Sequence, residues 1–423
     1  MIQKLKRMLK GNFVKNVLIV ATGTVAAQAL SLLLQPIITR LYGPEAYGLM
    51  GIFIAIIAIV GPVSALTFPS AIVLPKEDKE ANSLISLSLV ITIIITLISI
   101  LVLLLFSDSI TYLFQLDGIE GFIFLIPIII LFAGIYQIME QWLIRTKQFK
   151  SYAKTTFFHV LLIQGSKVGI GLYNPIAAVL IVLTALGEGL RAFLMIVVDK
   201  QINYKEVLKL RSLEVYKNTF RNYKDFPIFR APQTFINAIS QNLPVLMLTA
   251  FFGPASAGFY VLSRTVLNMP TQLIGKAVGD VFYPRISEAR NNNEDLKSLI
   301  KKATYSLAII GILPFGIIVA FGPQIFSFVF GDEWLIAGEY ARWISLWLFF
   351  MFINQPGIKA IPVLSLQAFQ LRYTIVTLII RVTAIGIGYY IFSSELIAIA
   401  LFGVSGAIRT LLLTIIVIRK SGN

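Results

Sequence analysis

Long apolar runs dominate the chain and determine its predicted secondary structure. A run of about 20 apolar residues is the length at which an α-helix crosses the hydrocarbon of a bilayer. Twelve such runs occur, at residues 13–38, 46–73, 82–106, 121–144, 155–172, 175–198, 227–252, 255–283, 296–321, 338–361, 373–392 and 396–418. The pattern predicts an all-α integral membrane protein with twelve transmembrane helices.

The composition fits a protein surrounded by lipid. Hydrophobic residues make up 57% of the 423 residues and charged residues only 13%, against about 25% in ordinary soluble domains. Cysteine is absent and there is a single histidine, which excludes disulfides and the usual zinc sites, so we predict no metal and no cofactor. The net charge is +15, but the bases punctuate apolar runs and form no solvated arm, so nucleic acid is not an expected partner.

Lysine and arginine are distributed unevenly between the predicted loops. Of the 36 basic residues, 25 fall in alternate connections on one side, and only Arg40 falls in a connection on the other. Because positively charged short loops stay in the cytoplasm, both termini are predicted to be cytoplasmic and the number of spans even. The largest inside connection, residues 199–226, mixes basic and apolar residues. This mixture suits an amphipathic helix on an anionic leaflet, with a solvated linker as the alternative.

The same landmarks occur twice in the same order. Tyr42-Gly43-Pro44 with Gly48 returns as Phe252-Gly253-Pro254 with Gly258, displaced by 210 residues. Three further pairs keep a similar displacement: Phe68-Pro69 with Tyr283-Pro284 (215), Phe149 with Phe369 (220) and Arg191 with Arg409 (218). Six spans separate the copies, so residues 1–205 and 206–423 are predicted to form two parallel six-helix lobes. Such repeats are typical of transporters, with the substrate path between the lobes.

These landmarks also carry a resemblance to a known family. The segment 40–48 reads Arg-Leu-Tyr-Gly-Pro-Glu-Ala-Tyr-Gly. It resembles the hallmark of the polysaccharide transporters, the O-antigen and oligosaccharide-lipid flippases of the multidrug/oligosaccharidyl-lipid/polysaccharide exporter superfamily. Residues 283–287 (Tyr-Pro-Arg-Ile-Ser) and 330–334 (Phe-Gly-Asp-Glu-Trp) are similar to further landmarks of that family. The resemblance implies two six-helix lobes in a V around a central cavity, lined by the first, second, seventh and eighth spans.

The resemblance implies a flippase and not an enzyme. Such a flippase moves an undecaprenyl-pyrophosphate-linked oligosaccharide from the cytoplasmic to the outer leaflet by alternating access, for cell-surface polysaccharide biosynthesis. A proton, a sodium ion or the membrane potential would drive it. The implied location is the plasma membrane of a bacterium or archaeon. The implied partners of this monomeric transporter are anionic membrane lipids, a polysaccharide polymerase and other assembly proteins.

Two other functions remain open at this point. A multidrug or cation antiporter of the same superfamily would be expected to hold its cations with buried carboxylates, which the excess of bases argues against. A membrane glycosyltransferase or polymerase would need placed catalytic groups and usually a sizeable outside loop, whereas the predicted outside connections are short.

Ten basic residues but only four acidic residues lie at membrane depth. A charge at the bilayer centre costs about 2.5–3.5 kcal/mol, so most of these residues must face protein or a hydrated cavity. The pairs spaced to meet on one helix face are Glu188–Arg191, Lys276–Asp280 and Glu339–Arg342. The residues near enough to the cytoplasmic ends to reach water by snorkelling are Lys15, Lys359 and Arg409.

A cavity with more bases than acids favours an anion, such as the pyrophosphate of a lipid-linked sugar. The predicted anion-binding residues are Arg230, Arg264, Lys276 and Lys167, with Arg40 as a cationic gate at the outer mouth. The predicted sugar-binding residues are Asn237, Gln241 and Asn242, and the predicted ion-coupling residues are Glu140 and Asp280. For each base a plain packing role is the alternative. Lys167 and Lys276 also lie within small-xxx-small segments, which favour close helix contact.

Reporter fusions test the predicted orientation. A fusion within residues 199–226 should report a cytoplasmic location, because the seven bases of this loop hold it inside. A fusion within residues 107–120 should report an outside location. A reversal at either position would refute the span map.

Overall fold

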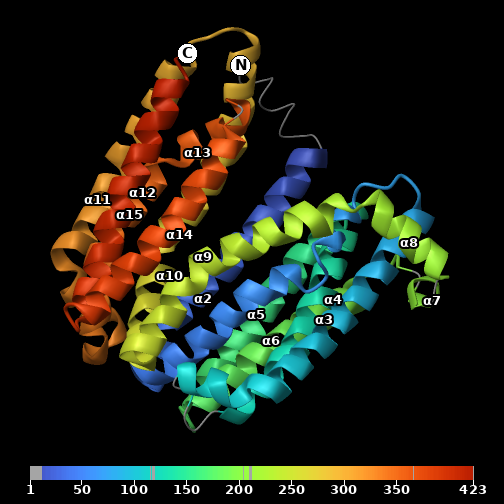
Figure 1. The fold of residues 1–423 in the computed structure, drawn as a ribbon, viewed down its shortest axis with the longest axis horizontal. Helices are drawn as coiled ribbons and strands as arrows, with labels where there is room; N and C mark the ends of the chain where they lie inside the picture. Colours follow the sequence, from blue (N-terminus) through green and yellow to red (C-terminus); the bar gives the residue numbers. More distant parts are fainter. Residues whose placement is uncertain are drawn as a thin grey trace. The chain divides into compact units, whose positions relative to one another are not determined.

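The computed structural model describes residues 12–114, 116, 120–202, 204–208, 212–364 and 366–422. For residues 12–21, 205, 208, 270, 272–281, 284, 367, 368 and 371 it describes the backbone alone. Over these residues the regular secondary structure is helical, with no strand, which confirms the predicted all-α class (Figure 1).

The helices follow the order of the predicted spans. The first half contains α2 (Asn12–Val60), α3 (Asp78–Leu113), α4 (Ile126–Arg145), α5 (Phe149–Gly171) and α6 (Ala177–Val198). Two short helices, α7 (Tyr204–Leu208) and α8 (Leu213–Asn222), follow in the long inside connection. The second half contains α9 (Ala231–Phe252), α10 (Pro254–Asn291), α11 (Leu296–Phe330), α12 (Leu335–Ile353), α13 (Gln355–Val363), α14 (Gln367–Tyr390) and α15 (Glu395–Lys420).

Three predicted boundaries differ from the structure. The first two predicted spans form one helix, α2, which is kinked at Gly43 (φ 70°, ψ 173°) with no intervening loop. The predicted outside connection 322–337 is mostly helical, because α11 continues past a non-helical Phe321 and through Pro323. The tenth predicted span is divided between α12 and α13 at Asn354, just before Pro356, whose missing amide cannot extend the preceding helix.

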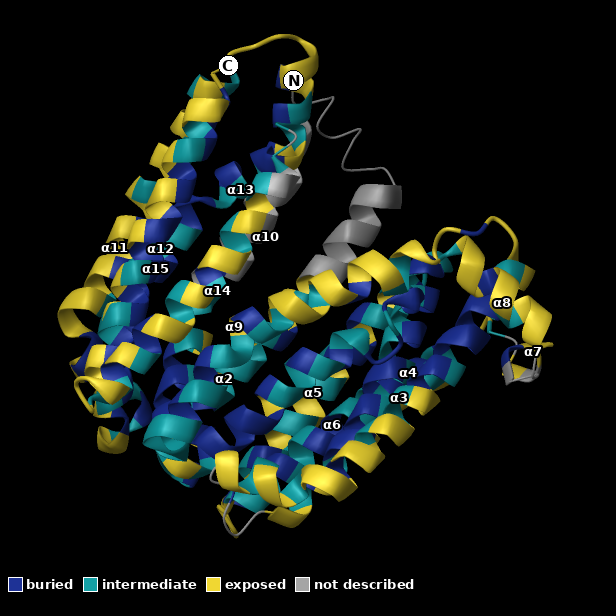
Figure 2. Ribbon diagram, viewed as in Figure 1, coloured by how far each residue is buried: buried dark blue, intermediate teal, exposed yellow. Residues whose placement is uncertain are grey.

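Nine helical stretches within the described residues are long and apolar enough to cross a membrane, and the first of them, Thr22–Val63, is long enough for two spans. Large apolar side chains on these helices stay exposed, for example Leu97, Leu101 and Leu104 of α3. Figure 2 shows such exposed positions along the outer face of this helix. Surface of this kind is stable only against lipid, so the chain is a multi-pass membrane protein. The number of twelve spans and the V arrangement stay predictions.

Contacts divide the chain into two compact units. Unit 1 comprises Met1–Tyr42 with Leu49–Leu243, and unit 2 comprises Gly43–Gly48 with Pro244–Asn423. Packing therefore assigns most of α9, which follows the predicted lobe boundary at residue 205, to unit 1. The division of the chain into lobes at that boundary stays a prediction.

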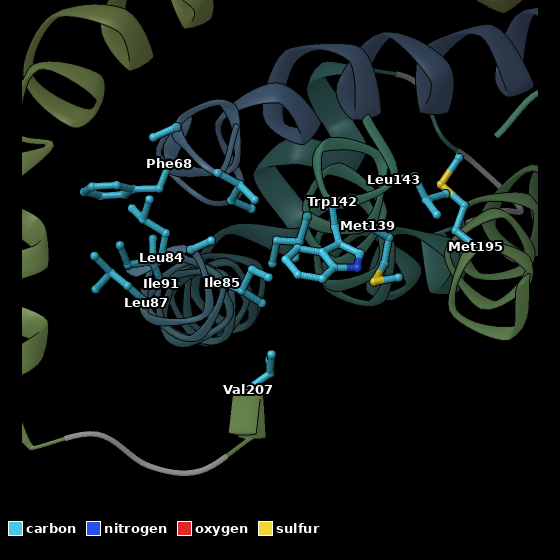
Figure 3. Packing of buried hydrophobic residues seen from close by; sticks show 14 residues of the cluster. Phe68, Leu84, Ile85, Leu87, Ile91, Met139, Trp142, Leu143, Met195 and Val207 are labelled. Carbon is cyan, nitrogen blue, oxygen red and sulfur yellow. The ribbon is translucent and has the colours of Figure 1, made fainter. Parts of the chain in front are cut away.

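Unit 1 is a bundle whose core lies between α3, α4 and α6. Its buried residues include Ile85 of α3, Trp142 of α4 and Met195 of α6; in Figure 3 the Trp142 indole lies next to Ile85, and Met195 lies next to Leu143. Val207 of the short helix α7 joins the same cluster. Burial of each large apolar side chain contributes about 1.5–3 kcal/mol, so this core fixes the inside connection to the bundle.

Unit 2 is organised around the repeated Gly-Pro landmarks. Gly43 and Gly253 have matching positive φ angles of 70° and 89°, each directly before a proline, so the predicted repeat has the same backbone conformation in both copies. The contact between the copies is reciprocal. A Cβ atom on Gly48 would overlap the carbonyl oxygen of Pro254, and one on Gly258 would overlap that of Pro44. Only glycine allows two helices to approach so closely.

The landmark at residues 330–334 joins this contact. Trp334 is 1% exposed. Its ring packs in a T-shaped arrangement against the rings of Tyr47 and Phe259, with centroid distances of 5.5 Å and 6.0 Å. Glu333 lies beside Gly43, where a Cβ atom would be 3.3 Å from its carboxylate oxygen. Three motifs that are far apart in the sequence therefore form one packed junction in unit 2.

Substitution of Gly258 tests this junction. Gly258→Ala should lower the Tm of the detergent-solubilised protein, because an overpacked methyl group costs about 1–3 kcal/mol. The matched control is Gly165→Ala in α5, where a Cβ atom would meet nothing within 4 Å. Alanine there should be neutral or stabilise by about 1 kcal/mol through helix propensity. Equal Tm values for the two variants would contradict the close approach.

Candidate functional site

Three of the predicted binding residues lie on one exposed face formed by α9 and the helical turn directly before it, in unit 1. Arg230 closes a turn of π-helix, Phe226–Arg230, whose second residue is Pro227. Such turns interrupt regular α-helical hydrogen bonding and are frequent at functional sites. The Arg230 guanidinium is exposed and lies 5.5 Å from the centroid of the Phe226 ring. Asn237 and Gln241 follow at helical spacing on the same face, both exposed.

The three predicted sugar-binding amides are placed differently. Gln241 Nε2 donates to Asn237 Oδ1 at 3.4 Å, so these two side chains form an exposed polar pair. Asn242 Nδ2 instead donates to the Ala238 carbonyl of its own helix at 2.9 Å. Asn237 and Gln241 therefore remain suited to contact a polar ligand beside Arg230, whereas the amide of Asn242 is engaged by the backbone.

Lys167 is held in the interior of unit 1. It is 7% exposed, and its Nζ lies 3.3 Å from the sulfur of Met50, a weak acceptor. The hydroxyl of Tyr42, the first residue of the Tyr-Gly-Pro landmark, donates to the Lys167 carbonyl at 2.8 Å. A methyl group at Gly165 or Gly169 would meet nothing within 4 Å among the described atoms, so none of the described helices packs closely against these two glycines.

Glu140 lies at the centre of a hydrogen-bonded cluster in unit 1. Its Oε1 accepts from the hydroxyls of Tyr136 and Tyr152, each at 2.8 Å. The Arg191 guanidinium lies 3.9 Å from the centroid of the Tyr136 ring. The cluster joins α4, α5 and α6. The Glu140 carboxylate accepts from the hydroxyl of Tyr136, and the Arg191 guanidinium lies over the ring of the same tyrosine. The side chain of Asp280, the second predicted ion-coupling residue, lies outside the described residues.

The remaining predicted bases belong to both units. Arg40 is exposed, three residues before the kink at Gly43, within unit 1. Arg264 lies on α10 in unit 2 and is half-buried. The side chain of Lys276 lies outside the described residues. That all of these bases line one cavity stays a prediction.

The same-helix pairs were predictable from spacing, and one is confirmed. Arg342 Nη1 lies 3.2 Å from Glu339 Oε1, and its Nη2 donates to the Ala320 carbonyl at 3.0 Å.

The prediction that Arg409 snorkels to the cytoplasmic end is wrong. Arg409 is 7% exposed and lies 11 residues before the end of α15, about 16 Å along the helix axis at 1.5 Å per residue. A snorkelling side chain cannot cover that distance. The sequence signal that could have placed it was the repeat, since Arg409 matches Arg191 at a displacement of 218. Together with Arg381, Arg409 is a candidate binding residue that sequence reasoning missed.

Comparison with solved structures identifies the fold. The lipid II flippase MurJ in an inward closed conformation matches with a TM-score of 0.75 at 15% identity, over 95% of this chain and 87% of that one. An inward-facing multidrug resistance MATE family transporter of the MOP superfamily matches with a TM-score of 0.68 at 16% identity, over 93% and 94%. A MOP superfamily transporter from Pyrococcus furiosus, described by the reverse polarity of its binding pocket, matches with 0.59 at 14%, over 98% and 97%.

This is the fold of the MOP-superfamily transporters, the class of membrane carrier that includes the MATE proteins. The sequence profile of the family described as polysaccharide biosynthesis protein matches residues 37–339, and the chain belongs to that family. No curated protein matches the sequence closely enough to add to this. The family match confirms the predicted link to polysaccharide biosynthesis, and the fold is the one that these transporters share; transport by this chain stays a prediction.

Removing the tyrosine hydroxyls tests the Glu140 cluster. Tyr152→Phe and Tyr136→Phe each delete one donor to the carboxylate, and a hydrogen bond to a charged group contributes about 1.5–3 kcal/mol. Both variants should therefore lower the Tm in detergent by a few degrees. The control is Tyr173→Phe, whose side chain is 93% exposed and which should melt like the parent. Unchanged melting of both cluster variants would show that the hydrogen bonds do not stabilise unit 1.

Proposed function

We propose that the protein is a flippase that moves a lipid-pyrophosphate-linked oligosaccharide from the cytoplasmic to the outer leaflet by alternating access. The observation that carries the proposal is the exposed helix face on which Arg230, at the end of the π-helical turn, is followed at helical spacing by the amides of Asn237 and Gln241 on α9. A guanidinium binds phosphate oxygens in pairs, and amides donate to and accept from sugar hydroxyls. The family match and the similarity to a lipid II flippase support a lipid-linked glycan as the cargo.

The charges of the described side chains favour this cargo over an organic cation. A cation antiporter would be expected to present a buried carboxylate to its substrate. The carboxylate of Glu140 is instead satisfied within unit 1 by two tyrosine hydroxyls. The bases Arg230 and Arg40 are exposed, which suits contact with an anionic ligand.

The orientation and the lipid partner are supported by α8. Tyr216 and Tyr223 dock this helix onto unit 1, through hydrogen bonds to Ser86 at 2.9 Å and to Glu80 at 3.0 Å. Burial and the bond to Glu80 raise the pKa of Tyr223 to about 12, so it stays a neutral donor. The exposed bases of α8 and the residues after it lie at helical spacing and are Lys217, Arg221 and Lys224. A stripe of bases suits contact with the anionic lipids of a cytoplasmic leaflet. On this proposal both termini lie on the cytoplasmic side as well. The membrane would be the plasma membrane of a bacterium or archaeon.

The transport cycle requires a driving force, which we assign to a proton or sodium ion acting at Glu140, with Asp280 as the second candidate residue. Glu140 suits this role because protonation would remove the charge that organises Tyr136, Tyr152 and the neighbouring Arg191. The membrane potential is the alternative source of energy. A polysaccharide polymerase and other assembly proteins would act on the delivered glycan, and the transporter would work as a monomer.

Single substitutions at the proposed binding residues test this function in cells. Arg230→Ala, Arg264→Ala and Lys276→Ala should each reduce surface polysaccharide export about 10- to 100-fold, because a lost charge-assisted contact is worth about 1.5–3 kcal/mol. Export is measured at matched expression of the variants. Glu140→Gln should abolish the dependence of export on the pH gradient or on sodium, whichever the parent protein shows.

The matched control is Arg372→Ala, an exposed base at the start of α14. This variant should export normally. If all three binding variants keep full export at normal expression, the anion-binding account is wrong.

A further inference from the structure

Two consecutive residues between α2 and α3 adopt a left-handed backbone conformation. Leu66 and Thr67 have φ angles of 47° and 60°. A positive φ is disfavoured for residues with a Cβ atom, and most strongly for β-branched residues such as threonine. Such outliers persist only where the surrounding structure holds them, and they concentrate at functional sites. The contacts of Thr67 therefore indicate its role.

Thr67 is hydrogen-bonded to the helical turn that ends at Arg230. Its side chain is 5% exposed, and its Oγ1 donates to the Phe226 carbonyl at 3.0 Å. The same carbonyl accepts from the Ala231 amide, which is the i→i+5 bond that makes this turn π-helical. In an α-helix the carbonyl would accept from the Arg230 amide instead. Thr67 thus bonds to the carbonyl oxygen on which the register of the turn depends.

Packing in unit 1 holds the segment around Thr67 in place. Phe68 is fully buried, and its ring centroid lies 5.6 Å from that of Phe220 on α8. Gln137 of α4 donates through Nε2 to the hydroxyl of Ser64 at 3.1 Å. These contacts to two other helices flank Thr67 on both sides in the sequence, so they offset the unfavourable backbone conformation.

The ring of Phe226 supports the guanidinium of Arg230. The Cζ of Arg230 lies 5.5 Å from the ring centroid of Phe226. The ring of Tyr223 lies 6.4 Å away on a centroid-to-centroid basis, and the Tyr223 hydroxyl donates to Glu80 at 3.0 Å. An aromatic face restrains the plane of a guanidinium without using its N–H donors. Phe226 is therefore bonded through its backbone to Thr67 and contacts Arg230 through its side chain.

We propose that Thr67 is a positioning residue for Arg230 and acts through the carbonyl and the ring of Phe226. The inference rests on the proposed function, in which Arg230 contacts the pyrophosphate of the cargo. An exposed arginine loses conformational entropy when it binds a ligand, and a side chain that is restrained beforehand loses less. The left-handed backbone is retained because it directs the Thr67 hydroxyl to the Phe226 carbonyl.

Hydrogen exchange of the purified full-length protein in detergent tests the link between Thr67 and the turn. Thr67→Val removes the hydroxyl and keeps the shape of the side chain. The amides of residues 226–231 should exchange about 10-fold faster, because the loss of one hydrogen bond of ordinary strength favours local opening by this factor. Thr67→Ser keeps the donor and should exchange at the parent rate.

The matched control is Thr92→Val in α3. Thr92 is fully buried, and its Oγ1 donates to the Ser88 carbonyl of the same helix at 2.8 Å, so this variant also loses one hydroxyl bond inside unit 1. Its Tm should fall about as far as that of Thr67→Val. The amides of residues 226–231 should keep the parent rate, since the loss is confined to α3. Equally faster exchange in both valine variants would indicate general loosening of unit 1 and count against the proposal.

Surface polysaccharide export at matched expression tests the link between the turn and Arg230. Thr67→Val should lower export about 10-fold, and Thr67→Ser should retain most of it. In an Arg230→Ala background Thr67→Val should cause no further loss, because the side chain that Thr67 positions is absent. Non-additivity of this kind separates a positioning role from a purely structural one.

Phe226→Leu tests the second link independently of whether Thr67→Val folds. This variant removes the ring but keeps the backbone carbonyl. It should lower export in the parent background and not in the Arg230→Ala background. The amides of residues 226–231 should exchange at the parent rate, because the bond from Thr67 remains.

Three results would overturn the proposal. The first is a parent rate of exchange at residues 226–231 in Thr67→Val. The second is the same fold-loss of export from Thr67→Val with and without Arg230. The third is normal export by Phe226→Leu where Arg230→Ala loses export.

The inference and the proposed function fail in different ways. Normal export by Arg230→Ala would refute the anion-binding role of Arg230 and, with it, the need to position that residue. Reduced export by Arg230→Ala together with normal export by Thr67→Val would refute the positioning role alone and leave the proposed function standing.

Discussion

Hydrocarbon offers no partner to an unpaired polar group, and this constraint accounts for most of the structure. Each backbone segment at membrane depth must complete its hydrogen bonds within itself, which makes the described chain helical. The same constraint decides where helices can bend. The breaks fall at Gly43, at Phe321 before Pro323 and at Asn354 before Pro356, where the local sequence either permits a positive φ or removes a backbone donor.

The constraint also governs the charged side chains. Unit 1 resolves a buried carboxylate and a guanidinium internally, through tyrosines on adjacent helices. Unit 2 pairs Arg342 with Glu339 and places the Arg409 guanidinium against the ring of Tyr373, with its Nε and Nη1 atoms buried without a hydrogen-bond partner among the described residues. The repeat therefore conserves geometry while changing electrostatics. A duplicated helical bundle can thus keep one packing scheme and still develop two chemically distinct interiors.

Periodicity and spacing predicted much of the fold but little of the site. The order of the helices follows the apolar runs, and the matching φ angles of Gly43 and Gly253 agree with the predicted repeat at its Gly-Pro landmark. The Glu339–Arg342 pair follows from residues one turn apart. Contacts between helices had no such signal: the hydroxyl of Tyr152 on α5 reaches Glu140 on α4, and spacing along one chain does not report which faces meet. Distance to the nearest predicted loop gives the wrong location for Arg409, because burial depends on the neighbours that α15 packs against.

The six residues Gly43–Gly48 belong by sequence to the first half and by packing to unit 2. Gly48 packs against Pro254, and Gly258 packs against Pro44. In the repeat Gly48 is equivalent to Gly258 and Pro44 to Pro254, so each copy contacts the other through the same two positions. A substitution in either copy therefore alters the packing of the other copy. A new side chain at Gly48 or Gly258 would need a compensating change in the other copy, at Pro254 or Pro44, which lie 206 and 214 residues away in the sequence. Because each copy limits the side chains that the other can carry here, the sequences of the two copies constrain each other at this junction.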